Sequence, residues 1–317
     1  MKLRVAAVQM EHKGGDINYN LKVIGDFVKQ ASKDKADVIS FPECCTVGYM
    51  FLAKLPLEEI QKLAQPLDGF IVKQLVEYAK MNNIIIAAGM LEKDIEENIF
   101  NTYVTVGPKG LINSFRKMHP FINTAIKPGN EYKIYDLLGW KASTLICYDI
   151  ASIPENSRAV SLLGAEIIFA PHQAGGFDYP NAGMGIIAQD LWINREKNPD
   201  ALKKEFLGSK GREWLMKWLP SRAYDNALYI VYTNGVGLDG PKEVRTGNAC
   251  ILDPTGIILA ESFALGDDMV IADCDINEIK KALGTVCKQS RRPSLYKILC
   301  KGEDGKTQPV WKAFKKL

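Results

Sequence analysis

The sequence has little excess charge of one sign and no long hydrophobic run. Its 317 residues carry 40 Lys and Arg against 37 Asp and Glu, a net charge of +3. This balance argues against a dedicated nucleic-acid binder or a polybasic membrane binder. No apolar stretch approaches the roughly 18 residues that span a bilayer. The first ten residues alternate like a strand instead of forming a signal-peptide core.

Paired cysteines and metal-binding motifs are also missing. The seven cysteines are odd in number and none forms a CxxC pair, unlike the even, dense pattern of small secreted domains. The three histidines, His12, His119 and His172, are scattered and form no HExxH motif, which disfavours a zinc hydrolase. We therefore expect a reduced, cytoplasmic protein. A chain this long can bury a core without disulfides or a structural metal.

Short apolar runs separated by helical stretches predict an α/β fold. Leu3–Gln9 is typical of a strand, a helical repeat covers 21–31, and Ala36–Phe41 is typical of a second buried strand. This order predicts helices that cover a sheet core. Further predicted strands are Ile84–Met90, Thr102–Val106, Ser143–Cys147, Glu166–Ala170, Leu228–Tyr232, Ala249–Leu252, Ile257–Ala260 and Met269–Ala272, and further predicted helices are Pro56–Ala64, Ile71–Met81, Pro154–Leu163 and Ile276–Leu283.

The segment around Cys147 has local features of a nucleophile. A predicted strand ends at Cys147, a short polar turn follows, and Pro154–Glu155 is typical of the first turn of a helix. A cysteine that faces a helix N-terminus lies in positive potential, which can lower the thiol pKa from about 8.5 towards roughly 3.5–7.5. The alternative is that Cys147 is a small buried hydrophobic residue, as most free cysteines are. The local pattern leaves both interpretations open.

Two charged residues also follow predicted strands. Glu43 comes directly after a strand and a proline, and Lys117 follows Ser114–Phe115. Ligands of α/β proteins usually bind at the carboxyl ends of strands. A solvated side chain is the ordinary alternative for either residue taken alone. Together with Cys147, however, these residues give three chemically useful groups at the ends of three separate strands.

These segments together resemble the nitrilase superfamily, the carbon–nitrogen hydrolases, whose hallmark is a Glu–Lys–Cys triad. The matching segments read FPE around Glu43, RKMH around Lys117 and ICYD around Cys147. RVAAVQM, RAYDNALYIVYTNGVG, TGNACILDPTGIILAES and SRRPSLY resemble further family segments in the same order. The resemblance implies that Glu43 is the general base, that Cys147 forms a thioester, and that Lys117 and the backbone N–H after Cys147 hold the oxyanion. Cys44 and Cys45 lack the strand–turn–helix setting and are expected to pack.

The resemblance also implies a fold, a reaction and an assembly. The fold is an α/β, four-layer α-β-β-α sandwich over residues 1–300, with a longer pocket-side segment at about 172–219 and a C-terminal tail at 301–317. The expected activity is hydrolysis of a small amide or N-carbamoyl substrate without metal or cofactor. The alternatives are a nitrilase acting on a nitrile, or a catalytically silent relative that serves as a binding or scaffold protein. The expected assembly is a homodimer or higher homo-oligomer, into which the tail, with Trp311 and Phe314, would extend.

The sequence departs from the family pattern beside the lysine. Many members carry a second glutamate before the following Pro-Gly, but the stretch MHPFINTAIKPG contains no acid. Asn123 or Thr124 falls near the expected place and Glu131 lies beyond it, which suggests an altered substrate preference. For His172, a structural hydrogen-bonding role is the alternative to substrate binding. The candidate substrate contacts are Tyr148, His172, Asn123 and Glu131, with Gln173, Phe177 and Tyr179 as further candidates on position.

Overall fold

The computed structural model describes residues 1–176, 185–240, 242–302 and 304. The predicted substrate contacts Phe177 and Tyr179, and the tail residues Trp311 and Phe314, lie outside the described residues. No helix in the described ranges is long and apolar enough to cross a membrane.

Strands and helices alternate along the chain as the sequence predicts. The strands are β1 (Lys2–Met10), β2 (Val38–Ser40), β3 (Ile85–Lys93), β4 (Ile99–Gly107), β5 (Gly110–Arg116), β6 (Ile126–Lys127), β7 (Tyr135–Leu137), β8 (Trp140–Thr144), β9 (Ile167–His172), β10 (Tyr229–Asp239), β11 (Glu243–Thr246), β12 (Cys250–Leu252), β13 (Ile258–Glu261) and β14 (Asp268–Asp275). The helices are α1 (Ile17–Lys33), η1 (Met50–Lys54), α2 (Leu57–Leu63), α3 (Phe70–Asn82), α4 (Tyr148–Ala151), α5 (Pro154–Leu162), α6 (Gln189–Ile193), α7 (Pro199–Leu207), α8 (Arg212–Met216), α9 (Leu219–Tyr224), α10 (Ile276–Lys281), α11 (Leu283–Gln289) and η2 (Pro293–Cys300).

Strand β1 joins the two halves of the structure. On one side it pairs in parallel with β2, and the ladder continues through β3 and β4 to β5. On its other side it pairs antiparallel with β14, while Gln9 and Met10 pair in parallel with Asn234 and Gly235 of β10. From β10 the order continues through β9 and β8 to β7. The parallel pairs bring several strand C-termini to one edge.

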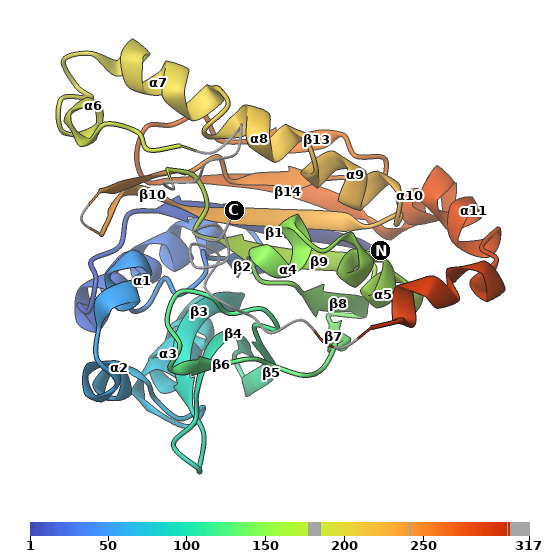
Figure 1. Ribbon diagram of the computed structural model, residues 1–317, viewed down its shortest axis with the longest axis horizontal. Helices are drawn as coiled ribbons and strands as arrows, with labels where there is room; N and C mark the ends of the chain where they lie inside the picture. The colour runs from blue at the N-terminus through green and yellow to red at the C-terminus, as the bar shows by residue number, and fades with distance from the viewer. Residues whose placement is uncertain (177–184, 241, 303, 305–317) are drawn as a thin grey trace.

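The alternating side chains of β1 enter two different cores. Leu3 and Val5 pack in a core shared with β8, β9 and β10, whereas Ala6 and Val8 pack in a second core with α1 and α3. Because successive side chains point to opposite faces, the sheet is covered on both sides. Helices α5 and α9 pack against β8–β10 in the core that contains Leu3 and Val5 (Figure 1). The predicted four-layer α-β-β-α sandwich is confirmed.

The segment before β10 is helical, although none of the helices predicted from apolar spacing lies in it. Helices α6 to α9 follow one another along one side of the molecule (Figure 1). Trp192 of α6 and Phe206 of α7 form a small core of their own with Val236 and Val244. The segment is therefore packed against β10 and β11.

Glycine at position 89 allows the loop after β2 to lie against β3. A Cβ atom added to Gly89 would lie 2.2 Å from the backbone N of Cys44 and 2.8 Å from the backbone C of Glu43. Real Cβ atoms do not approach backbone this closely, so the loop carrying Glu43 depends on this glycine.

We predict that Gly89→Ala lowers the free energy of unfolding by about 1–3 kcal/mol, because the added methyl overpacks a rigid backbone contact. Gly107→Ala on β4 is the matched control, since its Cβ would have side-chain neighbours and no backbone atom nearby, the nearest being the flexible end of Ile112 at 3.0 Å. Urea denaturation of both variants tests this. Equal losses of stability in the two variants would contradict the close-approach explanation.

Candidate active site

A fully buried ion pair joins the ends of β2 and β5. Lys117, directly after β5, places its Nζ 2.6 Å from Oε1 of Glu43, in the loop after β2, and both side chains are 0% exposed. Nδ2 of Asn101 donates to the same oxygen, also at 2.6 Å. Oε2 of Glu43 is buried and has no hydrogen-bond partner among the described residues. The two carboxylate oxygens therefore differ: one is anchored and the other is available.

Lys117 is held as an ammonium ion. Burial opposes its charge, but the negative charge of Glu43 raises the pKa of Lys117 well above its ordinary value. Its Nζ also lies 4.8 Å from the ring centroid of Phe121 and 5.7 Å from that of Tyr49. These distances are in the range of cation–π attraction. The site thus holds a permanent positive donor beside the carboxylate.

Cys147 lies on a strained turn between β8 and α4. Its backbone has φ 50° and ψ −104°, a region that residues other than glycine rarely adopt. Its N–H donates to the Pro171 carbonyl at 2.9 Å, and its own carbonyl accepts from the N–H groups of Ile150 and Ala151. These hydrogen bonds hold the turn, and the residue is 7% exposed.

The Cys147 thiol is protonated at rest. Burial, followed by the negative charge of Glu43, raises the pKa of Cys147 to about 12, although Lys117 and a backbone hydrogen bond from Gln173 act in the opposite direction. This direction is opposite to the lowering that a helix N-terminus can cause, which was one of the two interpretations that the sequence left open. The helix expected at Pro154 is α5, which begins seven residues after Cys147. The helix that begins directly after Cys147, α4, has only four residues, and burial together with a nearby carboxylate has the larger effect.

Asp149 fixes the lysine segment to the cysteine turn. Its buried carboxylate accepts from the backbone N–H groups of Met118, at 3.1 Å, and His119, at 2.9 Å. Nδ1 of His119 lies 2.8 Å from the same carboxylate. Since Asp149 is two residues after Cys147 and Met118 directly follows Lys117, these bonds set the spacing between sulfur and ammonium.

Aromatic rings surround the charged pair. Tyr49 meets Phe121 edge to face at a centroid distance of 6.5 Å, and Phe121 meets Tyr148 at 5.7 Å. His119 lies 6.2 Å from Tyr148. The Tyr49 hydroxyl is buried, with no hydrogen-bond partner in the described part of the chain. Tyr148, a predicted substrate contact, therefore belongs to an aromatic wall next to the cysteine.

Asn123 and Glu131 have other contacts. The Asn123 amide donates to the carbonyls of Leu52, at 2.8 Å, and Leu55, at 3.1 Å, and so holds its loop to η1. Glu131 is 67% exposed and pairs with Lys133 at 2.9 Å. Within the described ranges, neither side chain has a hydrogen bond or ion pair with the three groups described above. The place of the family's second acid is thus not taken by a carboxylate from this stretch.

His172 is enclosed by aromatic rings. Its Nδ1 lies 2.9 Å from the Ala170 carbonyl, and its ring stacks on Trp218 at 5.5 Å and lies 4.6 Å from Tyr232. Burial lowers the pKa of His172 to about 3, so the ring is neutral and its Nδ1–H donates to the carbonyl. These contacts favour the structural, hydrogen-bonding role for His172 over the alternative of substrate binding.

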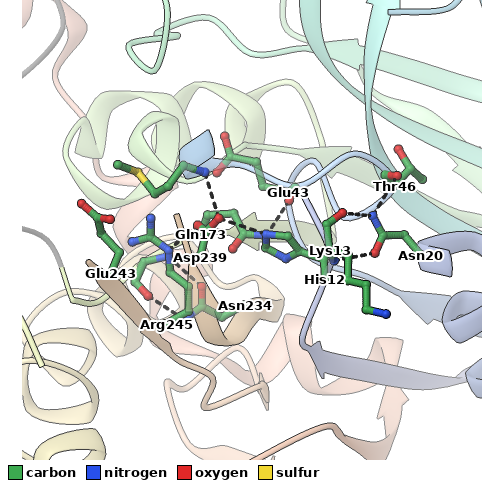
Figure 2. Close-up of polar contacts among 12 residues, drawn as sticks. His12, Lys13, Asn20, Glu43, Thr46, Gln173, Asn234, Asp239, Glu243 and Arg245 are labelled. Carbon is green, nitrogen blue, oxygen red and sulfur yellow. Dashed lines mark hydrogen bonds and ion pairs between the residues drawn. The ribbon is translucent and has the colours of Figure 1, made fainter. Parts of the chain in front are cut away.

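A second buried ionic network supports the loop that carries Glu43. Asp239 accepts from Nε of Arg245 at 2.8 Å and from the backbone N–H of Met50 at 2.9 Å, and it lies 3.1 Å from Nε2 of His12 (Figure 2). Despite burial, the charges of Arg245 and His12 hold the pKa of Asp239 below its ordinary value. Arg245 also donates to the Gly175 carbonyl at 2.7 Å. The network thus joins the ends of β1 and β10 to η1.

Three supporting residues have weak sequence signals. Asn101 interrupts an apolar strand, and Asp149 sits two residues after a cysteine. Gln173 was a candidate by position; its Nε2 donates to the Glu43 carbonyl at 2.8 Å (Figure 2). A polar residue within an apolar strand is the signal that could have identified Asn101. In the described part of the chain, no group of three or more His, Cys, Asp or Glu residues is arranged to hold a metal ion.

Comparison with known proteins matches this architecture. The family model for carbon-nitrogen hydrolases covers residues 4–282. A nitrilase of Pyrococcus abyssi (strain GE5 / Orsay) is 32% identical over 279 residues, covering 86% of this chain and 90% of the relative. An (R)-stereoselective amidase of a Pseudomonas species is 26% identical over 284 residues, covering 88% of each. A solved mutant of the amidase from Nesterenkonia sp. AN1, with acrylamide added to its active-site cysteine, has a similar fold, with a TM-score of 0.69 at 19% identity, covering 94% of this chain and 99% of that one.

The buried neutral histidine makes stability depend on pH. The pKa of His172 in the folded protein, about 3, lies below the ordinary value of 6.5. The contribution of His172 to the free energy of unfolding is therefore complete above pH 6.5 and is lost as pH falls towards 3. For this group alone, we expect a loss of about 2 kcal/mol between pH 7 and pH 5. His172→Phe should therefore show a smaller drop in the free energy of urea unfolding over this interval. An unchanged drop would mean that His172 titrates normally.

Proposed function

Because the chain belongs to the carbon-nitrogen hydrolase family, we propose that it hydrolyses a non-peptide C–N bond through a thioester on Cys147. In this proposal residues 1–300 form one hydrolase domain, and Glu43, Lys117 and Cys147 are its catalytic residues. The observation that carries the proposal is the buried Glu43–Lys117 pair beside a protonated thiol. A thiol with a raised pKa needs a base at the moment of attack, and a carboxylate with one unoccupied oxygen can serve.

The reaction divides into acylation and deacylation. Oε2 of Glu43 takes the thiol proton while sulfur adds to the carbonyl carbon, and the carbonyl electron pair moves onto oxygen. The ammonium of Lys117 and the N–H of Tyr148 stabilise this oxyanion; the latter opens α4 and therefore has no acceptor within that helix. The proton then passes from Glu43 to the departing amine as the C–N bond breaks. Water, deprotonated by Glu43, attacks the thioester, and the thiol and a carboxylic acid are released.

A small, neutral amide or N-carbamoyl compound fits the chemistry of the site best. The charges of Glu43 and Lys117 cancel, so the site does not require a charged partner at the reacting carbon. The wall formed by Tyr49, Phe121 and Tyr148 favours an apolar or flat acyl group. A nitrile is the close alternative, which the name of the Pyrococcus relative supports. A silent binding relative is the other alternative, motivated by the absent second acid.

We predict that Cys147→Ala abolishes turnover and that Glu43→Gln lowers kcat by about 10²–10⁴-fold, since the thiol then lacks its base. Cys274→Ala is the matched control, because Cys274 is also buried and its pKa is also raised to about 12, but it lies on β14. Ammonia or amine release measures the rate, and intact mass spectrometry measures the acyl-enzyme. Turnover by Cys147→Ala would exclude this nucleophile.

A paired panel separates the candidate functions. Matched amides, N-carbamoyl compounds and nitriles with the same small substituent are assayed for ammonia release. We expect the highest kcat/KM with the amide or N-carbamoyl compound. Faster turnover of the nitrile would favour the nitrilase alternative. No turnover and no selective labelling of Cys147 by an electrophile would favour the silent relative.

We also propose that the chain forms a homodimer or a larger homo-oligomer. Leu295, Ile298 and Leu299 of η2 are 58%, 65% and 66% exposed, and Val286 of α11 is 55% exposed. Exposed apolar side chains gathered on neighbouring elements are typical of an interface.

We predict that sedimentation velocity shows at least a dimer and that Ile298→Asp weakens it, because a buried charge in an interface is costly. Ile95→Asp is the control, since Ile95 is 99% exposed in the β3–β4 turn, far along the chain from η2. A monomer at all concentrations would contradict self-association.

A further inference from the structure

Asn101 contacts two of the proposed catalytic residues at once. It lies on β4 and is 1% exposed. Its backbone carbonyl accepts the N–H of Lys117 at 2.8 Å, and its side-chain Nδ2 donates to Oε1 of Glu43 at 2.6 Å. One residue therefore fixes the backbone of the lysine and the carboxylate of the glutamate. It carries no charge at any pH and makes no chemical step of its own.

The orientation of the Asn101 amide follows from electrostatics. If the amide were reversed, its Oδ1 would face the Glu43 carboxylate, and two acceptors would meet at hydrogen-bond distance. The observed orientation leaves Oδ1 buried, without a hydrogen-bond partner in the described ranges. Leaving a buried acceptor unpaired is unfavourable. The bond to the carboxylate is thus the contact that determines how this side chain lies.

The two donors share one carboxylate oxygen. Lys117 Nζ and Asn101 Nδ2 both bind Oε1 of Glu43, at 2.6 Å each, while Oε2 has no partner among the residues described. A carboxylate held by two donors on one oxygen cannot rotate freely, and its other oxygen keeps its lone pairs for a proton. If only Lys117 bound Oε1, the Glu43 carboxylate could still rotate about that single hydrogen bond.

We propose that Asn101 is a positioning residue for the general base: it fixes Oε1 of Glu43 so that Oε2 exchanges the proton with the Cys147 thiol. This inference rests on the proposed function, in which that thiol attacks a carbonyl carbon. In the step concerned, the S–H bond breaks and an O–H bond forms on Oε2 as the S–C bond forms. The same proton later leaves Oε2 for the amine nitrogen when the C–N bond breaks.

The inference predicts a specific kinetic change for Asn101→Leu. This variant keeps the volume but removes the donor, and we expect kcat to fall about 10- to 100-fold, as for a lost hydrogen bond to a charged group. KM should change little, because the amide does not contact substrate. The acidic limb of the pH profile of kcat/KM should move to higher pH, because a lost donor disfavours the charged carboxylate. Asn101→Asp keeps the shape but adds a second carboxylate, and should move this limb further.

Thr102→Val is the matched control. Thr102 is the next residue on β4, is fully buried, and donates its hydroxyl to a carboxylate oxygen of Glu92 at 2.6 Å. The control therefore removes a hydrogen bond of the same type from a carboxylate outside the proposed triad. Circular dichroism and urea unfolding compare the folding of all variants. If Thr102→Val lowers kcat and moves the acidic limb as Asn101→Leu does, the role of Asn101 is only structural and the inference is wrong.

Alkylation of Cys147 by iodoacetamide tests the inference without a substrate. The rate constant and its pH dependence are measured by mass spectrometry for the wild type, Asn101→Leu, Asn101→Asp and Glu43→Gln. We expect slower alkylation at neutral pH in all three variants. If only Glu43→Gln is slower, Glu43 is the base but Asn101 does not position it. If all three match the wild type, the proposed base itself is wrong, and the inference fails with it.

Discussion

The desolvated ion pair between Glu43 and Lys117 is the interaction on which the rest of the site depends. Burying two charges costs several kcal/mol per ion unless their geometry and additional hydrogen bonds compensate. Here the compensation comes from the 2.6 Å contact itself and from the Asn101 amide. Since one unpaired buried charge would be strongly destabilising, the fold must deliver both residues together. The ends of β2 and β5 are therefore tied to a common position.

The surrounding structure can be understood as the means of holding that position. Gly89 lets the Glu43 loop approach β3, and the Gln173 amide binds the Glu43 carbonyl. Asp149 connects the lysine segment to the turn that carries Cys147. The strained φ of 50° at Cys147 persists because backbone hydrogen bonds over-determine the turn. The strained backbone of Cys147 and the buried charges of Glu43 and Lys117 thus lie at one edge of the sheet. Both features lower stability, and both hold the site in a defined geometry.

Much of this fold could be predicted from the sequence, and the reasons are physical. Buried strands give short apolar runs, so Ile84–Met90 and Ser143–Cys147 pointed to β3 and β8. Helices α6 and α7 could not be predicted in this way, because a small separate core with β10 and β11 holds them, not a strong repeat. Asn101 escaped notice because its partner Glu43 is 58 residues away and only the folded sheet brings them together. The sequence left the direction of the thiol pKa shift open, because the burial and the neighbouring carboxylate that outweigh a four-residue helix are known only from the fold.

The raised pKa of the Cys147 thiol determines how this residue would act as a nucleophile. A cysteine activated by positive potential would be a thiolate at all times and open to any electrophile that reached it. A thiol whose pKa is raised to about 12 is unreactive until its proton can move, and the unoccupied Oε2 of Glu43 is the acceptor at hand. In the proposed mechanism, the charge that develops on an oxygen beside the Lys117 ammonium makes this proton transfer more favourable. Reactivity is thereby coupled, in that mechanism, to a carbonyl or nitrile carbon placed between sulfur and ammonium.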